Sequence, residues 1–411
     1  MATIHPPAAG VTADDLTAIE ASLQADETAY LADLERLVNI DCGSYTPAGV
    51  DEVGRFVAGF LADLGATVEV RPDPTGRLGA TVIGTLSGPA SPGARLLLIG
   101  HMDTVFDPGT VAERPFAIAE GLATGPGVTD MKSGLLAGLY AIRALIRRGS
   151  LPFERLTFVA NPDEEIGSPT STPHIIELAA TADACLVLEC ARANGDIVSS
   201  RKGILDTRIQ VRGRAAHAGV EPEKGRSAIL AAADLVGRLH ALNGRWDGVT
   251  VNVGVIAGGT RPNVVPERCT LEVDVRAVRR EDLETAEAAI SELLRGLAVP
   301  DTTAELEPMA HWWPMEKLER SGRLVDHAVA LADRLGFSVR DTATGGASDA
   351  NTTAGLGVPS LDGLGPIGGN DHSPVEYLEV ASIVPRTTLV AGLVLAISRD
   401  PAIAAWRAER G

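Results

Sequence analysis

The fold is decided by the stretch ARLLLIGH, residues 94–101, an apolar run that ends in a histidine. Two similar runs follow, RLTFVANPDEE (155–165) and ACLVLEC (184–190), and both carry ionisable residues at or near their ends. Between the first two lies MKSGLLAGLYAIRALIRRG (131–149), which has the pattern of a buried helix closed by glycine. Continuous apolar strands separated by helices are typical of a largely parallel sheet covered on both faces, so the sequence predicts an α/β domain.

Outward from this stretch, the apolar pattern predicts further elements of the same domain. Helical spacing of apolar residues favours helices at 12–40, 48–65 and 385–398, and short apolar runs favour strands at 67–70 and 79–86. A chain of 411 residues is too long for one ordinary core, so a second domain is expected.

The second domain begins where the pattern changes, near residue 200. Strands are predicted at 203–213, 249–260, 268–278 and 303–310, and helices at 227–242 and 281–297. Their order, strand–helix–strand–strand–helix–strand, is that of a ferredoxin-like sandwich. We therefore predict an α/β domain formed by 1–201 and 314–411, interrupted by an inserted ferredoxin-like domain at 202–313.

Composition excludes several classes of partner. The formal net charge of −18 argues against nucleic acid, because phosphate binding needs a basic face. No run approaches the length of about 18 apolar residues that a membrane span needs. Four separated cysteines without a C-x-x-C pair, and an N-terminus without the pattern of a signal peptide, fit a reduced protein. We expect a soluble cytoplasmic protein.

Ionisable residues follow the predicted strands, at the carboxyl ends where the loops of an α/β sheet converge. The candidates there are His101, Glu164, Glu165 and Glu189, and two glycine-rich loops supply Asp130 and His372. Taken singly, adjacent glutamates are usually a solvated face, and a loop histidine is as often a surface residue as a ligand. Taken together, two histidines and several carboxylates without a thiolate favour zinc or another borderline divalent ion.

The same segments resemble a known family. GHMDTV, GPGVTDMKSG, NPDEEIGS, VLEC, the AHAG of 216–219, GGTRPNVVP and GGASDA…NDHSP occur in the order of the co-catalytic zinc exopeptidases. That family includes glutamate carboxypeptidase, aminoacylase, acetylornithine deacetylase and succinyl-diaminopimelate desuccinylase. The resemblance spans residues 95–385, covers both predicted domains, and is strongest to the glutamate carboxypeptidase branch.

The resemblance implies a site for two zinc ions, with cobalt or manganese as substitutes. Asp130 would bridge the two ions, with His101 and Glu189 completing one and Glu165 and His372 completing the other. In this arrangement the bridged water would have a lowered pKa.

Further roles in the same loops also follow from the resemblance. Asp103 would orient the imidazole of His101, and Glu164 would be the general base that later protonates the leaving amine. The family has a cis peptide bond after the bridging aspartate, which would be Asp130–Met131 here. A second aspartate is common in the family at the position of Met131, so this chain departs from the pattern at a side chain that is not a ligand.

In the inserted domain, the resemblance implies a role for His217, which would otherwise be an ordinary loop histidine. It would reach across a homodimer and stabilise the oxyanion in the partner's active site. Arg276, Asn263 and Gly346 match substrate-binding positions, and an arginine fork suits a carboxylate. The substrate would therefore be a peptide or an N-acyl amino acid with a free carboxylate.

These expectations favour a zinc-dependent hydrolase of the glutamate carboxypeptidase type. An N-acyl-amino-acid deacylase or a dipeptidase is the nearest alternative. A relative that keeps the fold as a non-catalytic binding or scaffold protein is a different class, but it would have no need of Glu164. A metal-free serine or cysteine hydrolase is disfavoured, because no G-x-S-x-G segment is present.

Overall fold

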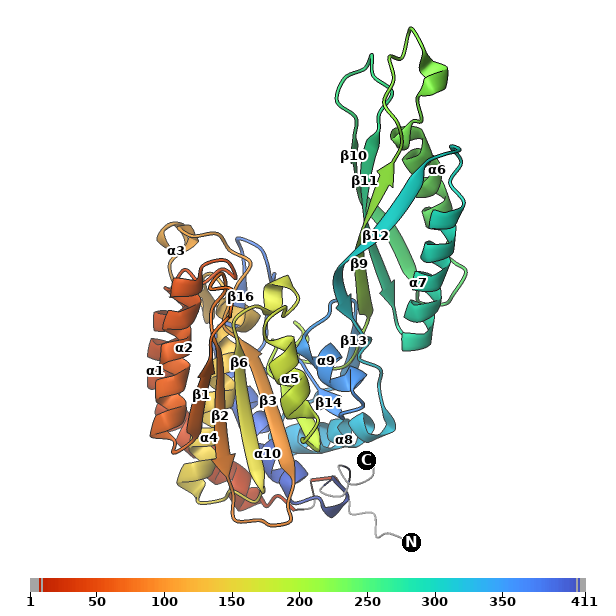
Figure 1. The fold of residues 1–411 in the computed structure, drawn as a ribbon. Coiled ribbons are helices and arrows are strands. Elements are labelled where there is room, and N and C mark those ends of the chain that lie inside the picture. The colour runs from red at the N-terminus through yellow and green to blue at the C-terminus, as the bar shows by residue number, and fades with distance from the viewer. Residues whose placement is uncertain (1–6, 9, 404–405, 407–411) are drawn as a thin grey trace. The chain divides into compact units, whose positions relative to one another are not determined.

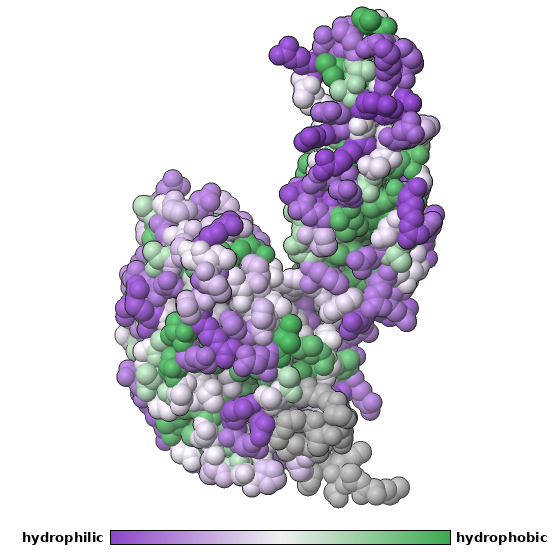
Figure 2. All heavy atoms as spheres, in the orientation of Figure 1, coloured by the Kyte–Doolittle hydropathy of each residue, from purple (hydrophilic) through white to green (hydrophobic). Residues whose placement is uncertain are grey.

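The computed structural model describes residues 7–8, 10–403 and 406, which form two compact units. Unit 1 comprises 1–200, 317–343 and 348–411, and unit 2 comprises Arg201–Glu316 with Thr344–Ala347. Residues 344–347 thus belong to unit 2 and not, as predicted, to the α/β domain. Hydrophilic residues spread over the visible surface of both units, with hydrophobic residues scattered among them (Figure 2).

Unit 1 is built on a six-stranded sheet of order β1-β2-β6-β3-β7-β14 (Figure 1). Its strands are β1 (Thr67–Arg71), β2 (Thr81–Ser87), β3 (Arg95–His101), β6 (Arg155–Asn161), β7 (Ala184–Val187) and β14 (Ser360–Leu361). β2 pairs antiparallel with β1 and β6, and the other pairings are parallel. The predicted α/β sheet is confirmed as a mixed, mostly parallel one. Because β3 and β6 are buried along almost their whole length, their sequence is continuously apolar.

Helices cover this sheet. The helices of unit 1 are α1 (Ala13–Val38), α2 (Pro47–Asp63), α3 (Thr110–Glu113), α4 (Ser133–Arg148), α5 (Thr172–Ala179), α8 (Glu319–Arg334), α9 (Asp349–Gly355) and α10 (Ile383–Ser398). α1, α4 and α10 pack on one another, and α5 packs on α9. Figure 1 shows α1 and α2 on one side of the strands and α5 on the other. The sheet is therefore enclosed between layers of helix.

The segment Val380–Ser398 corrects one expectation. It is a 19-residue helical segment with a mean hydropathy of 1.9, so it has the length and composition of a membrane span. Arg386 and its polar neighbours interrupt the apolar run, so the sequence shows no continuous apolar stretch of that length. In the structure, 78% of its most apolar window is buried inside the protein. Arg386 donates to the carbonyl oxygens of Gly195, Gly363 and Gly365, so its charge is satisfied within the core.

Short strands and turns of unit 1 were not predicted. β4 (Ala117–Ala119), β5 (Leu122–Thr124), β15 (Gly368–Gly369) and β16 (Tyr377–Glu379) form a sheet of order β15-β16-β5-β4, and β8 (Ile197–Arg201) pairs with β13 (Asp341–Thr344). The turns are η1 (Val128–Lys132), η2 (Glu164–Ile166) and η4 (Val380–Ser382). The small sheet joins the segment before Asp130 to the segment after His372.

Unit 2 is a four-stranded antiparallel sheet with two helices. β9 (Gly203–Arg212), α6 (Ala228–His240), β10 (Thr250–Gly258), β11 (Arg268–Ala277), α7 (Arg280–Arg295) and β12 (Thr303–Trp312) follow in that order, with the turn η3 (Pro222–Lys224) before α6. The strand order is β10-β11-β9-β12. Buried residues alternate along β9 and β11, and side chains such as Ile209, Leu235 and Ile290 form a separate core. The predicted ferredoxin-like sandwich is therefore confirmed.

Candidate metal centre

Three parallel strands bring candidate residues to the same edge of the main sheet. β3 ends at His101, whose partner in the register is Asn161 at the end of β6. Glu164 and Glu165 lie in η2, just beyond β6, and Glu189 lies two residues beyond β7. Because the carboxyl ends of parallel strands meet at one edge, the chain gathers these side chains without a long loop.

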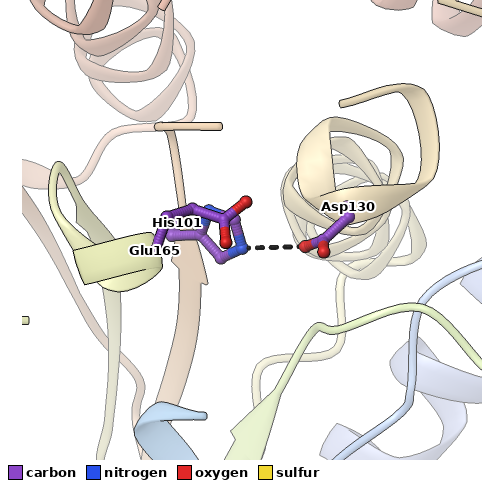
Figure 3. A group of neighbouring side chains, drawn as sticks. All are labelled: His101, Asp130 and Glu165. Atoms are coloured by element: carbon purple, nitrogen blue, oxygen red, sulfur yellow. Dashed lines mark hydrogen bonds and ion pairs between the residues drawn. The ribbon is translucent and has the colours of Figure 1, made fainter. Parts of the chain in front are cut away.

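Asp130 lies between two histidines. Its Oδ1 is 3.1 Å from Nε2 of His101, the interaction marked in Figure 3. Its Oδ2 is 3.1 Å from Nε2 of His372, which is also 3.1 Å from Oε2 of Glu165. On the other side, Nε2 of His101 is 3.7 Å from Oε1 of Glu189. The two oxygens of one carboxylate therefore face two separate sets of nitrogen and oxygen donors.

Two groups of these side chains could each hold a metal ion, because their ligand atoms all lie within 4.8 Å of one another. One group is His101, Asp130 and Glu165, and the other is His101, Glu164 and Glu189. The structure thus brings together all of the predicted ligands and the predicted base. The carboxylates of Glu164 and Glu165 are both close enough to the other candidate ligands to bind a metal ion. Distance alone therefore does not show which of the two is a ligand and which is the base.

Asp103 holds three parts of the site in place. Its Oδ1 is 3.3 Å from Nδ1 of His101, and its backbone carbonyl is 3.0 Å from the same nitrogen. The backbone N–H groups of Glu164 and Glu165 donate to its Oδ1 and Oδ2 at 3.1 and 3.2 Å. Ser44, which was not among the predicted site residues, donates its hydroxyl to Oδ2 at 2.6 Å. One buried carboxylate therefore fixes a histidine and both adjacent glutamates.

The loop that carries Asp130 has the cis peptide bond that the resemblance implied, between Asp130 and Met131. Sδ of Met131 lies 3.1 Å from the backbone nitrogen of His101, so this side chain packs beneath the site. Two further buried carboxylates border it. Glu376 accepts hydrogen bonds from the backbone of the Asp130 loop, and Asp349 accepts one from Ser168 at 2.7 Å. Neither carboxylate was among the predicted site residues.

The electrostatics of the site favour positive charge among its carboxylates. Hydrogen bonds to Asp130 and Glu165 raise the pKa of His372 to about 10. Burial opposes protonation of His101, but its carboxylate neighbours outweigh burial and hold its pKa well above the ordinary value. Burial raises the pKa of Glu164 well above the ordinary value, and that of Glu165 is raised for the same reason. Buried carboxylates of this kind are stable as anions only beside cations.

The donor set fits a divalent metal ion. Imidazole nitrogens with carboxylate oxygens and no thiolate are the ligands of zinc and of other borderline ions. Asp103 also supplies the carboxylate that commonly orients a metal-binding histidine through its second nitrogen.

The remaining predicted residues lie in unit 2. His217 is exposed, and its Nδ1 accepts a hydrogen bond from the backbone N–H of Gly219 at 3.1 Å. The segment of Asn263 pairs with it, since the N–H of Ala218 donates to the carbonyl of Asn263 at 3.0 Å. The guanidinium of Arg276 has partners inside the unit.

Arg276 binds Asp274 through its Nε and Nη2, and it donates to the carbonyl of Gly345 at 2.8 Å. Arg201 donates to the carbonyl of Gly346 at 3.0 Å. The loop 344–347 is therefore anchored to unit 2 by two arginines, which explains its grouping with that unit.

Comparisons with known proteins agree with this geometry. The model of peptidase family M20/M25/M40 matches residues 97–396. Carboxypeptidase G2 of Pseudomonas sp. (strain RS-16) is 31% identical over 373 residues, which cover 90% of this chain and 89% of that protein. Acetylornithine deacetylase of Edwardsiella ictaluri (strain 93-146) is 28% identical over 354 residues, with 82% and 88% covered.

A solved structure shows the same fold. Aminopeptidase PepT from Bacillus cereus ATCC 10987 superposes with a TM-score of 0.72 at 25% identity, covering 90% of this chain and 98% of that one. The family match spans both units and includes all of the metal-site candidates described above. The chain therefore belongs to peptidase family M20/M25/M40, a family of metallohydrolases.

Proposed function

We propose that this protein is a two-metal hydrolase that cleaves an amide bond next to a free carboxylate, with zinc as the metal. The observation that carries the proposal is the position of Asp130, whose two oxygens each lie 3.1 Å from a different histidine. Asp130 would be shared between two ions, His101 and Glu189 would complete one, and Glu165 and His372 would complete the other.

Glu164 is the general base of the proposed reaction. Divalent ions in such a site lower the pKa of a water and polarise the carbonyl of the scissile amide. The carboxylate of Glu164 would take a proton from that water and pass it to the leaving amine. The hydrogen bond from the backbone N–H of Glu164 to Asp103 keeps Glu164 beside the proposed metal ligands.

Two relatives support the proposed substrate class. Similarity to carboxypeptidase G2 supports release of a C-terminal amino acid, with glutamate as our first choice. Similarity to acetylornithine deacetylase supports the second candidate, an N-acyl-amino-acid deacylase. In both reactions the substrate carries a free carboxylate next to the amide bond that is cleaved. Arg276, Asn263 and Gly346 are the proposed binding residues for this carboxylate.

A homodimer is part of the proposal, with His217 acting in the active site of the partner subunit. Because the N–H of Gly219 donates to Nδ1, a neutral His217 carries its proton on Nε2. That N–H is the donor that an oxyanion needs. The exposure of His217 in unit 2 is also compatible with contact to another subunit.

A hydrolysis screen tests the function. The purified protein would be loaded with zinc, cobalt or manganese and offered dipeptides and N-acyl amino acids that differ only in the C-terminal residue. Preferential release of glutamate or aspartate from peptides and from N-acyl substrates supports the carboxypeptidase. Broad removal of acyl groups without regard to the amino acid supports the deacylase. Failure to hydrolyse either class with any of the three metals contradicts both.

A further inference from the structure

Glu376 binds the backbone of the loop that carries Asp130. Its side chain is buried, and its Oε1 accepts hydrogen bonds from the N–H groups of Thr129 at 2.8 Å and Asp130 at 3.0 Å. Its Oε2 accepts a third from the N–H of Gly127 at 2.9 Å. A carboxylate that receives three backbone N–H groups holds them more strongly than a neutral acceptor would.

The loop depends on an outside acceptor for these groups. Gly127, Thr129 and Asp130 lie before α4, so their N–H groups are not part of the hydrogen-bond ladder of that helix. Inside the turn η1, Asp130 has φ −111° and ψ 95°, which are not helical values. The regular hydrogen bonds of α4 therefore do not extend into this turn. A buried N–H group without a partner is costly. Glu376 therefore supplies the hydrogen-bond acceptors for these N–H groups that the neighbouring backbone does not provide.

Glu376 also belongs to the segment that carries the other metal-site histidine. It lies four residues after His372, and the next residue, Tyr377, pairs with Thr124 just before the Asp130 loop. His372 has a φ of 62° and Asn370 a φ of 59°, a left-handed conformation that non-glycine residues rarely adopt. A segment with two such residues needs anchors close by to keep one conformation.

From these contacts we infer that Glu376 is a positioning residue for the metal centre. Through its carboxylate it fixes the backbone of Asp130, and through the chain it fixes His372, so it sets the 3.1 Å spacing between Oδ2 of the first and Nε2 of the second. The inference rests on the proposed two-metal site but adds a residue that is not itself a ligand.

The substitution Glu376→Gln separates this role from simple packing. Glutamine has nearly the same shape, and its amide oxygen can still accept from Thr129 and Asp130. Its NH2 group would then face the N–H of Gly127, which places a donor against a donor. The matched control is Glu379→Gln, three residues further on, because Glu379 makes its hydrogen bonds to Ile367 and Ser382 through its backbone.

The test measures binding of zinc alone, without any substrate. Metal-free wild type, Glu376→Gln and Glu379→Gln would be titrated with zinc against a chromophoric chelator, and their cobalt forms compared by visible absorption. We expect zinc affinity to fall about 10- to 100-fold in Glu376→Gln, with an altered cobalt spectrum. The control should match the wild type in both measurements.

Each contrary outcome has a separate meaning. Wild-type affinity and an unchanged cobalt spectrum in Glu376→Gln would overturn the positioning role and leave the metal centre standing. Failure of the wild type itself to bind zinc would overturn the proposed function. If Glu376→Gln does not fold, Glu376→Asp takes its place, because it keeps the charge but shortens the side chain. A wild-type affinity for zinc in that variant would likewise overturn the inference.

Discussion

The backbone N–H of Glu164 donates to Oδ1 of Asp103 at 3.1 Å. The next residue, Glu165, donates its N–H to the other oxygen of the same carboxylate at 3.2 Å. One side chain thus holds two adjacent glutamates, whose own carboxylates go to different neighbours. Oε2 of Glu165 is 3.1 Å from His372, whereas Glu164 groups with His101 and Glu189. The two glutamates can therefore be tested as a matched pair.

Glu164→Gln should keep the fold and both metal ions but lose most of the hydrolytic rate. Removing a positioned general base typically lowers kcat by about 10²- to 10⁴-fold. Glutamine has nearly the same volume as glutamate, and the substitution leaves the hydrogen bond from the backbone N–H of residue 164 to Asp103 intact. Steady-state kinetics, together with metal analysis of the same preparation, would check both halves of this expectation.

Glu165→Gln is the comparison for that variant and should instead weaken metal binding. Its carboxylate contacts His372 directly, so the substitution removes a charged donor from the second ligand set. If Glu164→Gln loses metal while Glu165→Gln keeps it and loses rate, the roles of base and ligand are exchanged between the two residues.

Metal content should approach two ions per chain after equilibration with zinc and removal of the excess. The physical reason is that Asp130 presents one oxygen to each histidine, and five ligands are too many for one tetrahedral ion with an open position. Asp130→Asn should lower the affinity for both ions, whereas Glu189→Gln should mainly affect one. Full activity at a reproducible content of one ion would contradict the two-metal site.

Much of this fold could be predicted because the decisive strands are buried on both faces. β3 and β6 are continuously apolar for that reason, and the burial of β9 alternates along its whole length. β14, by contrast, has two residues and leaves no periodic pattern. The grouping of 344–347 with unit 2 also escaped prediction, because it depends on hydrogen bonds from arginines far away in the chain.

The candidate site was predictable to the extent that its residues follow strands. His101 and the glutamate pair come directly after buried runs, so the topology of a parallel sheet brings them together. Glu376 could not be found in this way. Its partners are backbone N–H groups, which every residue has, and the N–H of Gly127 lies 249 residues away in the chain. Ser44 was missed for the same reason, since nothing local marks its contact with Asp103.

The stability of unit 1 should depend on pH through Asp15 at the start of α1. This carboxylate caps the helix with Thr12 and accepts a hydrogen bond from Arg399 at 2.7 Å. Burial opposes ionisation of Asp15, but the bonds from Arg399 and Thr12 hold its pKa at about 2. Because the pKa of Asp15 is lower in the folded than in the unfolded state, its ionised form stabilises the folded protein by about 2 kcal/mol above about pH 4. This contribution is lost as the pH falls towards 2.

Asp15→Asn should therefore unfold more easily than the wild type at pH 7, and the difference should shrink as the pH is lowered from about 5 towards 3. Urea unfolding across that range, followed by circular dichroism, measures the difference in the free energy of unfolding. Asp14→Asn is the control, because Asp14 lies exposed in the same helical turn. A difference that stays constant with pH, or an equal effect in the control, would exclude the ionised Asp15 as the cause.

The last prediction concerns His217 and the proposed homodimer. His217→Ala should lose rate with little change in zinc affinity, because the residue lies in unit 2 and is not a proposed ligand. If it acts in the partner's active site, mixing His217→Ala with Glu164→Gln should restore some activity. In a mixed dimer, one site would receive an intact His217 from one chain and an intact Glu164 from the other.

The rescue is specific to action between subunits. If each chain completed its own site, every site in the mixture would still carry one defective residue, and no activity could return. Exchange of subunits must be shown on the same samples, by retaining an untagged variant on a resin through its tagged partner. With exchange demonstrated, a mixture no more active than its two components would mean that His217 works within its own chain or has no part in the reaction. Partial recovery that rises with the fraction of mixed dimer would mean that His217 acts in the active site of the neighbouring subunit. The donor there would be its Nε2–H, because Nδ1 accepts the hydrogen bond from Gly219.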